Sequence, residues 1–157
     1  MGEVISLKRL LEIRKKWRRK KVVFTNGIFD LIHYGHVKLL SDCKKLGDIL
    51  IVGLNSDKSA KKLKGKNRPI MSCMDRAGIL AAFRFVDYVV SFNEETPYRL
   101  ITKIRPDILA KGSDYKIVEI VGAKEVKAWG GEVVRVRLLR GRSTSGIVAR
   151  IKAGSVL

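Results

Sequence analysis

A continuous apolar run at residues 49–54 constrains the fold of this 157-residue chain more than any other segment. A strand that is apolar throughout, rather than at alternate positions, is typical of a parallel sheet covered on both faces. Four further runs also predict strands, and segments with apolar residues at helical spacing lie between them. The five predicted strands span residues 22–25, 49–54, 86–90, 107–110 and 132–138.

Helical spacing predicts one helix before the first strand and one after every strand. The N-terminal helix places Leu7, Leu10, Leu11 and Ile13 on one face, with Ser6 as a candidate N-cap. The remaining predicted helices span residues 35–46, 75–83, 97–104, 119–128 and 143–151. This alternation predicts an α/β fold, a Rossmann-like open parallel sheet of about five strands with helices on both faces.

The length and the charge indicate one domain with an anionic partner. We expect a basic N-terminal helix in residues 1–20 and a core in residues 21–151. The formal net charge of +18 favours a nucleotide, a sugar phosphate, nucleic acid or a membrane surface as partner. The basic run in residues 8–21 is more ordinarily a solvated helix face. A nucleic-acid groove would need interleaved aromatic side chains, and Trp17 is the one present there.

The sequence predicts a cytoplasmic protein without a membrane segment. The N-terminus has no apolar signal region, and no apolar stretch has the length of a transmembrane helix. Cys43 and Cys73 have no metal-ligand spacing with the histidines, and such unpatterned cysteines are compatible with a reducing compartment.

The two histidines, His33 and His36, lie where the first predicted strand gives way to a helix. Residues three apart share a helix face, so both imidazoles should project toward one point. The free N–H groups and partial positive charge of a helix N-terminus favour a phosphate at that point. A zinc site would need a third ligand, and none is evident. Neither G-x-G-x-x-G nor a P-loop pattern is present.

Further polar clusters also follow predicted strands, where open α/β sheets bind their ligands. Residues 61–69 form a basic segment that we expect to be a flexible loop, with Lys64 as the candidate that reaches a phosphate. Arg76 is either a phosphate ligand or a structural ion pair. Residues 111–115 suggest a pocket wall with a carboxylate and an aromatic ring. Residues 140–146 place arginines around a hydroxyl-rich helix start, which suits a pyrophosphate.

Nucleotidyl transfer accounts for all these clusters together. The acceptor would be a phosphate, which is already largely ionised at neutral pH because its second pKa is about 6, so no general base is needed. Negative charge builds on the α-phosphoryl oxygens and on the departing pyrophosphate, and cations and helix N-termini stabilise it. We expect Mg²⁺ as cofactor, held mainly by the nucleotide phosphates and water, and no metal site in the protein.

Residues 25–36, Thr-Asn-Gly-Ile-Phe-Asp-Leu-Ile-His-Tyr-Gly-His, resemble the first signature of the H-x-G-H nucleotidyltransferase superfamily. Residues 143–145, Ser-Thr-Ser, resemble its second signature, although a second threonine is usual at Ser145. The stretches 54–57, 111–115 and 120–123 resemble the branch that makes ADP-heptose from ATP and heptose 1-phosphate. The resemblance implies transfer of AMP to D-glycero-D-manno-heptose 1-phosphate for lipopolysaccharide or surface-glycan synthesis, by a cytoplasmic homodimer without a fused sugar-kinase domain.

Together with the clusters above, the resemblance implies roles for individual residues. His33, His36 and Lys64 are the expected catalytic residues. The expected nucleotide-binding residues, besides the two histidines, are Thr25, Asn26, Gly27, Ile28, Phe29, Asp30, Lys111, Gly112, Asp114, Tyr115, Gly141, Ser143, Thr144 and Ser145. Weaker candidates for a substrate phosphate are Lys64, Arg76, Arg140 and Arg142.

Two other functions remain open on the sequence. A cytidylyltransferase acting on glycerol 3-phosphate, or on a similar alcohol phosphate, would share the mechanism. Such relatives usually carry Arg-Thr-Glu-Gly before the Ser-Thr run and tryptophan in place of Tyr115, and both features differ here. A basic nucleic-acid-binding protein would explain the charge but would leave the histidine pair without a purpose, so we regard nucleic acid as the less favoured partner.

Overall fold

A parallel sheet of six strands forms the centre of the molecule in the computed structural model, which describes residues 1–154. The strand order is β1-β4-β3-β2-β5-β6, and every pair is parallel. The strands are β1 (Glu3–Val4), β2 (Val22–Gly27), β3 (Ile49–Asn55), β4 (Tyr88–Phe92), β5 (Ile108–Gly112) and β6 (Glu132–Val136). The predicted α/β class is confirmed.

The sheet has one strand more than the sequence predicted. β1 contains two exposed residues that pair with Tyr88 and Val89 at the sheet edge. A strand of this length has no periodicity from which it could be recognised. It extends the edge of the sheet without changing the order of the predicted strands.

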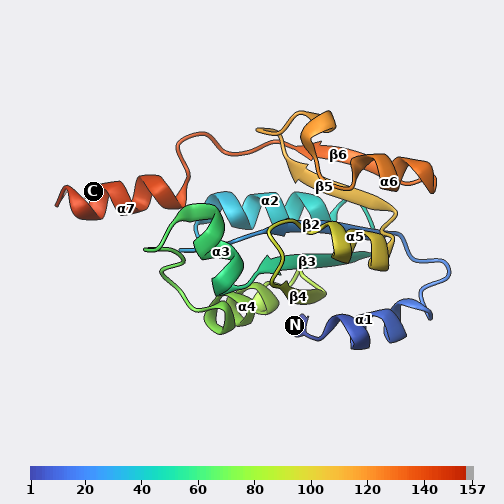
Figure 1. Ribbon diagram of the computed structural model, residues 1–157. Helices are drawn as coiled ribbons and strands as arrows, with labels where there is room; N and C mark the ends of the chain where they lie inside the picture. The colour runs from blue at the N-terminus through green and yellow to red at the C-terminus, as the bar shows by residue number, and fades with distance from the viewer. Residues whose placement is uncertain (155–157) are drawn as a thin grey trace.

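Helices cover both faces of this sheet, as expected (Figure 1). The helices are α1 (Leu7–Arg14), α2 (Tyr34–Lys44), α3 (Asp57–Lys64), α4 (Cys73–Ala82), α5 (Tyr98–Ile104), α6 (Ala123–Ala128) and α7 (Thr144–Lys152), with a 3-10 turn at Ile117–Glu119. One core cluster contains residues of α2 and α4, such as Leu40 and Leu80. The other contains residues of α1, α5 and α6, such as Leu10, Ile101 and Val126.

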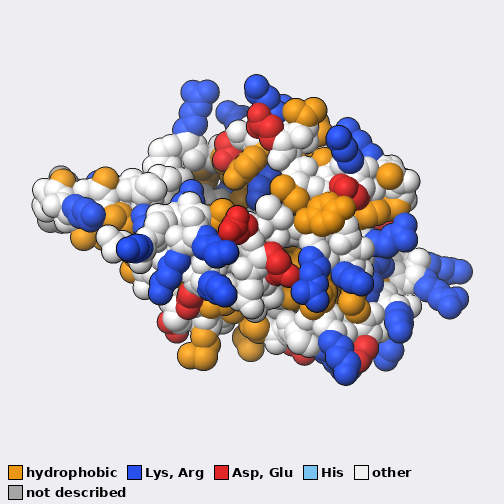
Figure 2. Space-filling view, in the orientation of Figure 1, with side chains coloured by type: hydrophobic (Ala, Val, Ile, Leu, Met, Phe, Trp, Pro, Cys, Tyr) orange, Lys and Arg blue, Asp and Glu red, His pale blue; other side chains and the backbone are white. Residues whose placement is uncertain are grey.

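The basic N-terminal helix is shorter than predicted. α1 begins after Ser6, whose side chain accepts a hydrogen bond from the Arg9 amide, so the predicted N-cap is confirmed. The helix ends at Arg14, and residues 15–20 form turns. Trp17 anchors these turns because its ring packs against Tyr88, with the two centroids 5.2 Å apart. Lys and Arg side chains are spread over much of the face seen in Figure 2 rather than gathered in one patch.

Two other segments differ from the prediction. The first part of the basic segment expected to be a flexible loop, residues 61–64, is helical. α3 is capped by Ser56 and continues to Lys64, where Gly65 with a positive φ of 95° ends it. The helix predicted over residues 119–128 is divided into the 3-10 turn and α6. Gly122 has φ 84° at the start of α6, which interrupts the helical path.

The strand order places a topological switch point at the end of β2. β3 and β4 lie on one side of β2, whereas β5 and β6 lie on the other. The loops that leave neighbouring carboxyl ends therefore diverge next to β2, and this is where open α/β sheets bind ligands. The sequence Thr25-Asn26-Gly27 ends β2 at this point.

α7 lies apart from the layers of the sheet (Figure 1). It contains no buried residue, and Ile151 is 69% exposed. Its first turn is nevertheless attached to the body of the protein, because the Thr144 hydroxyl donates a hydrogen bond to the Asp30 carbonyl at 2.5 Å. None of the helices in residues 1–154 combines the length and the apolar character that crossing a bilayer requires.

Candidate active site

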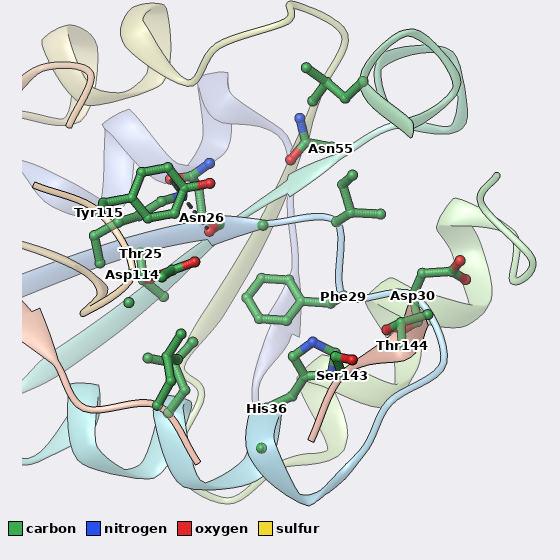
Figure 3. Close-up of a pocket in the computed structure, with 18 of the residues that line it drawn as sticks. Thr25, Asn26, Phe29, Asp30, His36, Asn55, Asp114, Tyr115, Ser143 and Thr144 are labelled. Atoms are coloured by element: carbon green, nitrogen blue, oxygen red, sulfur yellow. Dashed lines mark hydrogen bonds between the residues drawn. The ribbon is translucent and has the colours of Figure 1, made fainter. Parts of the chain in front are cut away.

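A cavity of about 690 Å³ opens at the carboxyl ends of β2, β3 and β5, next to the switch point. All but three of the predicted site residues line it, including both histidines, Lys64, and residues 143–145. The three exceptions are Arg76, Arg140 and Gly141. Figure 3 shows Phe29 between two groups of side chains, with His36, Ser143 and Thr144 on one side and Asn26, Asp114 and Tyr115 on the other.

The two imidazoles lie together on the cavity wall. Their rings are stacked, with the centroids 3.8 Å apart and the planes inclined by 23°. His33 is the N-cap residue of α2 rather than a residue of its first turn, and its side chain makes no capping hydrogen bond. The first amides of the helix are therefore left without a side-chain partner, beside both rings. This arrangement suits a phosphate group.

Gly35, between the two histidines, makes the stacking possible. A Cβ atom at this position would lie 2.9 Å from Cε1 and Nδ1 of His33. Any larger residue would therefore displace the first imidazole from the second. At Gly27, the space that a Cβ would take is bordered by the Phe29 ring at 3.0 Å. The two glycines thus make room for the side chains of this site.

The surroundings of both imidazoles lower their pKa values and so favour the neutral rings. Burial, and after it the nearby Arg142, lowers the pKa of His33. Burial, and after it His33, lowers the pKa of His36 from 6.5 to about 4, against a smaller opposite effect of Asp30. In both rings Nδ1 is buried and has no hydrogen-bond partner among the described residues, so Nε2 is the nitrogen that reaches the cavity. Each neutral ring can donate one hydrogen bond to a phosphate oxygen.

The start of α7 brings hydroxyl groups to the same part of the cavity. Ser143 is the N-cap, and its oxygen accepts a hydrogen bond from the Gly146 amide at 3.1 Å. Its proton remains available for a ligand, because a hydroxyl both accepts and donates. Thr144 is fixed by its bond to Asp30, and Arg142 lines the cavity beside His33.

The opposite wall comes from β5 and the turn that follows it. Lys111 donates hydrogen bonds to Oδ1 and the carbonyl of Asn26, at 2.9 and 3.2 Å, and lies 5.0 Å from the centroid of the Tyr115 ring. Burial lowers the pKa of this amine to about 8, against an opposite effect of Asp114. Asp114 and Tyr115, the carboxylate and the aromatic ring predicted for a pocket wall, therefore both line the cavity, together with Lys111.

Of the two roles left open for Arg76, the structure favours the structural one. Its side chain is fully buried, and its guanidinium donates to the carbonyls of Ile28, Asn55 and Met71 and to the Asp57 carboxylate. Four of its five N–H groups are used within the protein, and the buried side chain does not line the cavity, so it is not placed to bind a substrate. Arg140 lies outside the cavity, next to Lys38 and Arg137.

Gly141 also lies outside the cavity, and its backbone explains the glycine. Its φ of 71° is in the left-handed region that favours glycine, which directs the chain from residues 137–140 toward α7. We therefore interpret Gly141 as a turn residue that positions Ser143 rather than as a nucleotide contact.

Several cavity residues were not among the sequence candidates. They include Leu39, Asn55, Leu63, Arg68, Glu95, Thr96, Glu119, Leu138 and Leu139. Asn55 ends β3, and Glu95 and Leu138 come shortly after β4 and β6, so their position at the carboxyl edge of the sheet was a usable signal. Arg68 lies in the basic segment 61–69, but the sequence did not single it out, because its place depends on a contact with Asp30, 38 residues away. Residues 1–154 contain no group of three or more His, Cys, Asp or Glu side chains that could hold a metal ion.

The comparisons with known proteins agree with this site. Residues 24–147 match the model of the cytidylyltransferase-like family. The bifunctional protein HldE of Campylobacter concisus is 55% identical over 94% of this chain, and that of Syntrophotalea carbinolica is 52% identical over 93%. The chain spans about 30% of the length of these two relatives.

Solved structures show the same fold. A lipopolysaccharide core biosynthesis protein from Thermoplasma volcanium has a TM-score of 0.62 and 28% identity, covering 78% of this chain and 99% of its own. A pantothenate synthetase from Thermus thermophilus has a TM-score of 0.65 with 16% identity, covering 98% of this chain and 71% of its own, which supports the fold alone. The fold and the family match together place the chain in the class of α/β nucleotidyltransferases. More particularly, the chain belongs to the cytidylyltransferase-like family.

Proposed function

We propose that this protein transfers AMP from ATP to D-glycero-D-manno-heptose 1-phosphate, which yields ADP-heptose and pyrophosphate for lipopolysaccharide or surface-glycan synthesis. The observation that carries the proposal is the stacked pair of imidazoles at the switch point, beside the hydroxyl-bearing start of α7. The choice of sugar is supported by the resemblance of residues 54–57, 111–115 and 120–123 to the heptose branch, and by the identity to proteins named HldE.

The transfer requires one bond to form and one to break at the α-phosphorus of ATP. An oxygen of the acceptor phosphate attacks this phosphorus, and the bond to the bridging oxygen of the β-phosphate breaks, so pyrophosphate departs with the electron pair. The acceptor is already anionic, so no residue has to remove a proton. His33 and His36 donate hydrogen bonds to the α-phosphoryl oxygens, where charge develops.

The hydroxyl end of the cavity would hold the departing pyrophosphate. The Ser143 hydroxyl would donate a hydrogen bond to a phosphate oxygen. The amides of the first turn of α7 favour the negative charge. Arg142 adds a cation, and Lys64, at the end of α3, lines the same cavity from an exposed position. Asn26, Lys111, Asp114 and Tyr115 would border the nucleoside and the sugar on the opposite wall.

Mg²⁺ would be held mainly by the phosphates of ATP and by water. Within residues 1–154 no cluster of side chains offers a protein-built cage, and Mg²⁺ commonly keeps several waters when it binds with a nucleotide. When bound, the ion would neutralise charge on the leaving phosphates. We also propose a cytoplasmic homodimer, supported by two cysteines that form no disulfide and by the exposed Ile151 of α7. Sedimentation velocity would test the dimer.

A pyrophosphate-release screen tests the proposed function. ATP and CTP would each be combined with heptose 1-phosphate and with glycerol 3-phosphate, in the presence of Mg²⁺. We expect the largest kcat/KM for ATP with heptose 1-phosphate. Preference for CTP with glycerol 3-phosphate would replace the proposal by the cytidylyltransferase alternative. Salt-sensitive binding of duplex DNA without turnover of any pair would favour the nucleic-acid-binding alternative.

A further inference from the structure

Arg68 is a cation on the cavity wall whose guanidinium is only partly used by the protein. Its Nη1 donates to Oδ2 of Asp30 at 2.8 Å, and its side chain is 18% exposed. The described residues offer this guanidinium no other hydrogen-bond partner, and Arg68 lines the cavity. A guanidinium has five N–H donors, so several remain for a ligand. Arg76 is the contrast, because it is fully buried and donates four hydrogen bonds to protein atoms.

Asp30 fixes the position of this arginine through its carboxylate. Its side chain is 5% exposed and also accepts hydrogen bonds from the amides of Ile70 and Met71 at 3.0 Å. Its neighbours Phe29 and Leu31 have φ values of 50° and 38°, conformations that side-chain-bearing residues adopt only when the surroundings enforce them. The carboxylate therefore locks the loop before the histidines to the segment that carries Arg68.

The same residue also fixes which end of the cavity Arg68 faces. The carbonyl of Asp30 accepts a hydrogen bond from the Thr144 hydroxyl, and its carboxylate accepts one from the Arg68 guanidinium. Figure 3 shows Asp30 next to Thr144 and Ser143, at the end of the cavity away from Asn26 and Tyr115. One residue spans only a few ångströms, so Arg68 and the start of α7 border the same space.

We propose that Arg68 binds the β- and γ-phosphates of the nucleotide, the part that leaves as pyrophosphate, and that Asp30 is the positioning residue for Arg68. The guanidinium is suited to this because its planar fork matches two phosphate oxygens at once. Asp30 then acts through Arg68 and does not itself contact the nucleotide. The inference rests on the proposed nucleotidyl transfer for its ligand, but not on the identity of the acceptor.

Calorimetric titration of the intact protein with inorganic pyrophosphate and with AMP tests the proposal without any acceptor. AMP contains the α-phosphate but lacks the β- and γ-phosphates. Arg68→Gln should weaken pyrophosphate binding about tenfold or more, on the scale of charge-assisted hydrogen bonds, and should change AMP binding less than twofold. Lys66→Gln is the matched control, since it removes the same charge from an exposed side chain of the same loop that does not line the cavity. It should change neither affinity more than twofold.

The role of Asp30 has a separate readout. Asp30→Asn should weaken pyrophosphate binding in the wild-type background but have little further effect in the Arg68→Gln background, because the two residues act as one unit. It should also speed hydrogen exchange of the Ile70 and Met71 amides, whereas Arg68→Gln should leave this exchange unchanged. Thermal melting identifies any variant that fails to fold, and Arg68→Lys, which keeps the charge, should then recover part of the affinity.

Three results would overturn the proposal. Equal weakening of AMP and pyrophosphate by Arg68→Gln would show that Arg68 shapes the whole cavity. Unchanged pyrophosphate binding would show that it touches neither phosphate. Additive effects of Asp30→Asn and Arg68→Gln would show that Asp30 acts on its own. A failed heptose 1-phosphate assay would contradict the proposed substrate but would leave these titrations fully informative.

Discussion

The half-buried His36 imidazole should make the stability of the protein depend on pH in a defined window. Burial lowers its folded pKa from 6.5 to about 4. The unfolded chain therefore binds the proton more readily, so acid favours unfolding. The stabilisation is complete above pH 6.5 and is lost as the pH falls toward 4. At about 1.4 kcal/mol for each pKa unit, the shift corresponds to a loss on the order of 3 kcal/mol.

Thermal denaturation between pH 7.5 and 4 measures this loss. For a domain of this size, 3 kcal/mol corresponds to a fall in Tm of about 6–12 °C. Other groups titrate in the same range, so the relevant quantity is the difference between wild type and His36→Gln, which cannot take up the proton. The Tm of His36→Gln should fall clearly less than that of the wild type between pH 7.5 and pH 4. His33→Gln, which removes the neighbouring imidazole and keeps His36, serves as the comparison variant. Parallel curves for wild type and His36→Gln would refute the argument that His36 is buried in its neutral form.

Three further predictions concern activity and packing. His33→Ala and His36→Ala should each lower kcat about 100-fold or more while the Kd for ATP, from equilibrium dialysis, changes little; unchanged turnover in either variant would remove that ring from the mechanism. Lys64→Ala should lower kcat/KM about tenfold but shift the unfolding free energy by less than about 0.5 kcal/mol, because the side chain is exposed; a large fall in Tm would contradict this. Arg76→Met should destabilise the protein by about 3–5 kcal/mol in urea unfolding, since it leaves Asp57 and three carbonyls without their partner; near-wild-type stability would show that these bonds contribute little.

The sequence predicts the order of most elements because their apolar residues repeat with clear periods. Residues 49–54 fall within β3, and Ser6 and Ser143 cap the helices that follow them. The elements that could not be predicted either are too short to show such a period or are interrupted by a single residue with an unusual backbone conformation. β1 has two residues, and the left-handed Gly122 divides the helix expected over residues 119–128.

In the candidate site, too, some residues could be predicted from the sequence and others could not. His33 and His36 could be found because their spacing and place after a strand are visible in the chain, and the structure brings their rings together. The roles of Arg68 and Arg76 were harder to assign, because the groups that accept hydrogen bonds from each guanidinium come from other parts of the fold. Arg76 is enclosed by carbonyls from three segments, whereas Arg68 is directed to the cavity by Asp30. Both outcomes depend on tertiary contacts.

Phosphorus NMR of the reaction mixture tests the central claim most directly. With ATP, Mg²⁺ and heptose 1-phosphate, we expect a new sugar-nucleoside diphosphate and free pyrophosphate in equal amounts, and about 100-fold slower formation of both by His33→Ala at the same enzyme concentration. Formation of ADP and a doubly phosphorylated sugar, or of AMP without any sugar nucleotide, would contradict nucleotidyl transfer to the sugar phosphate.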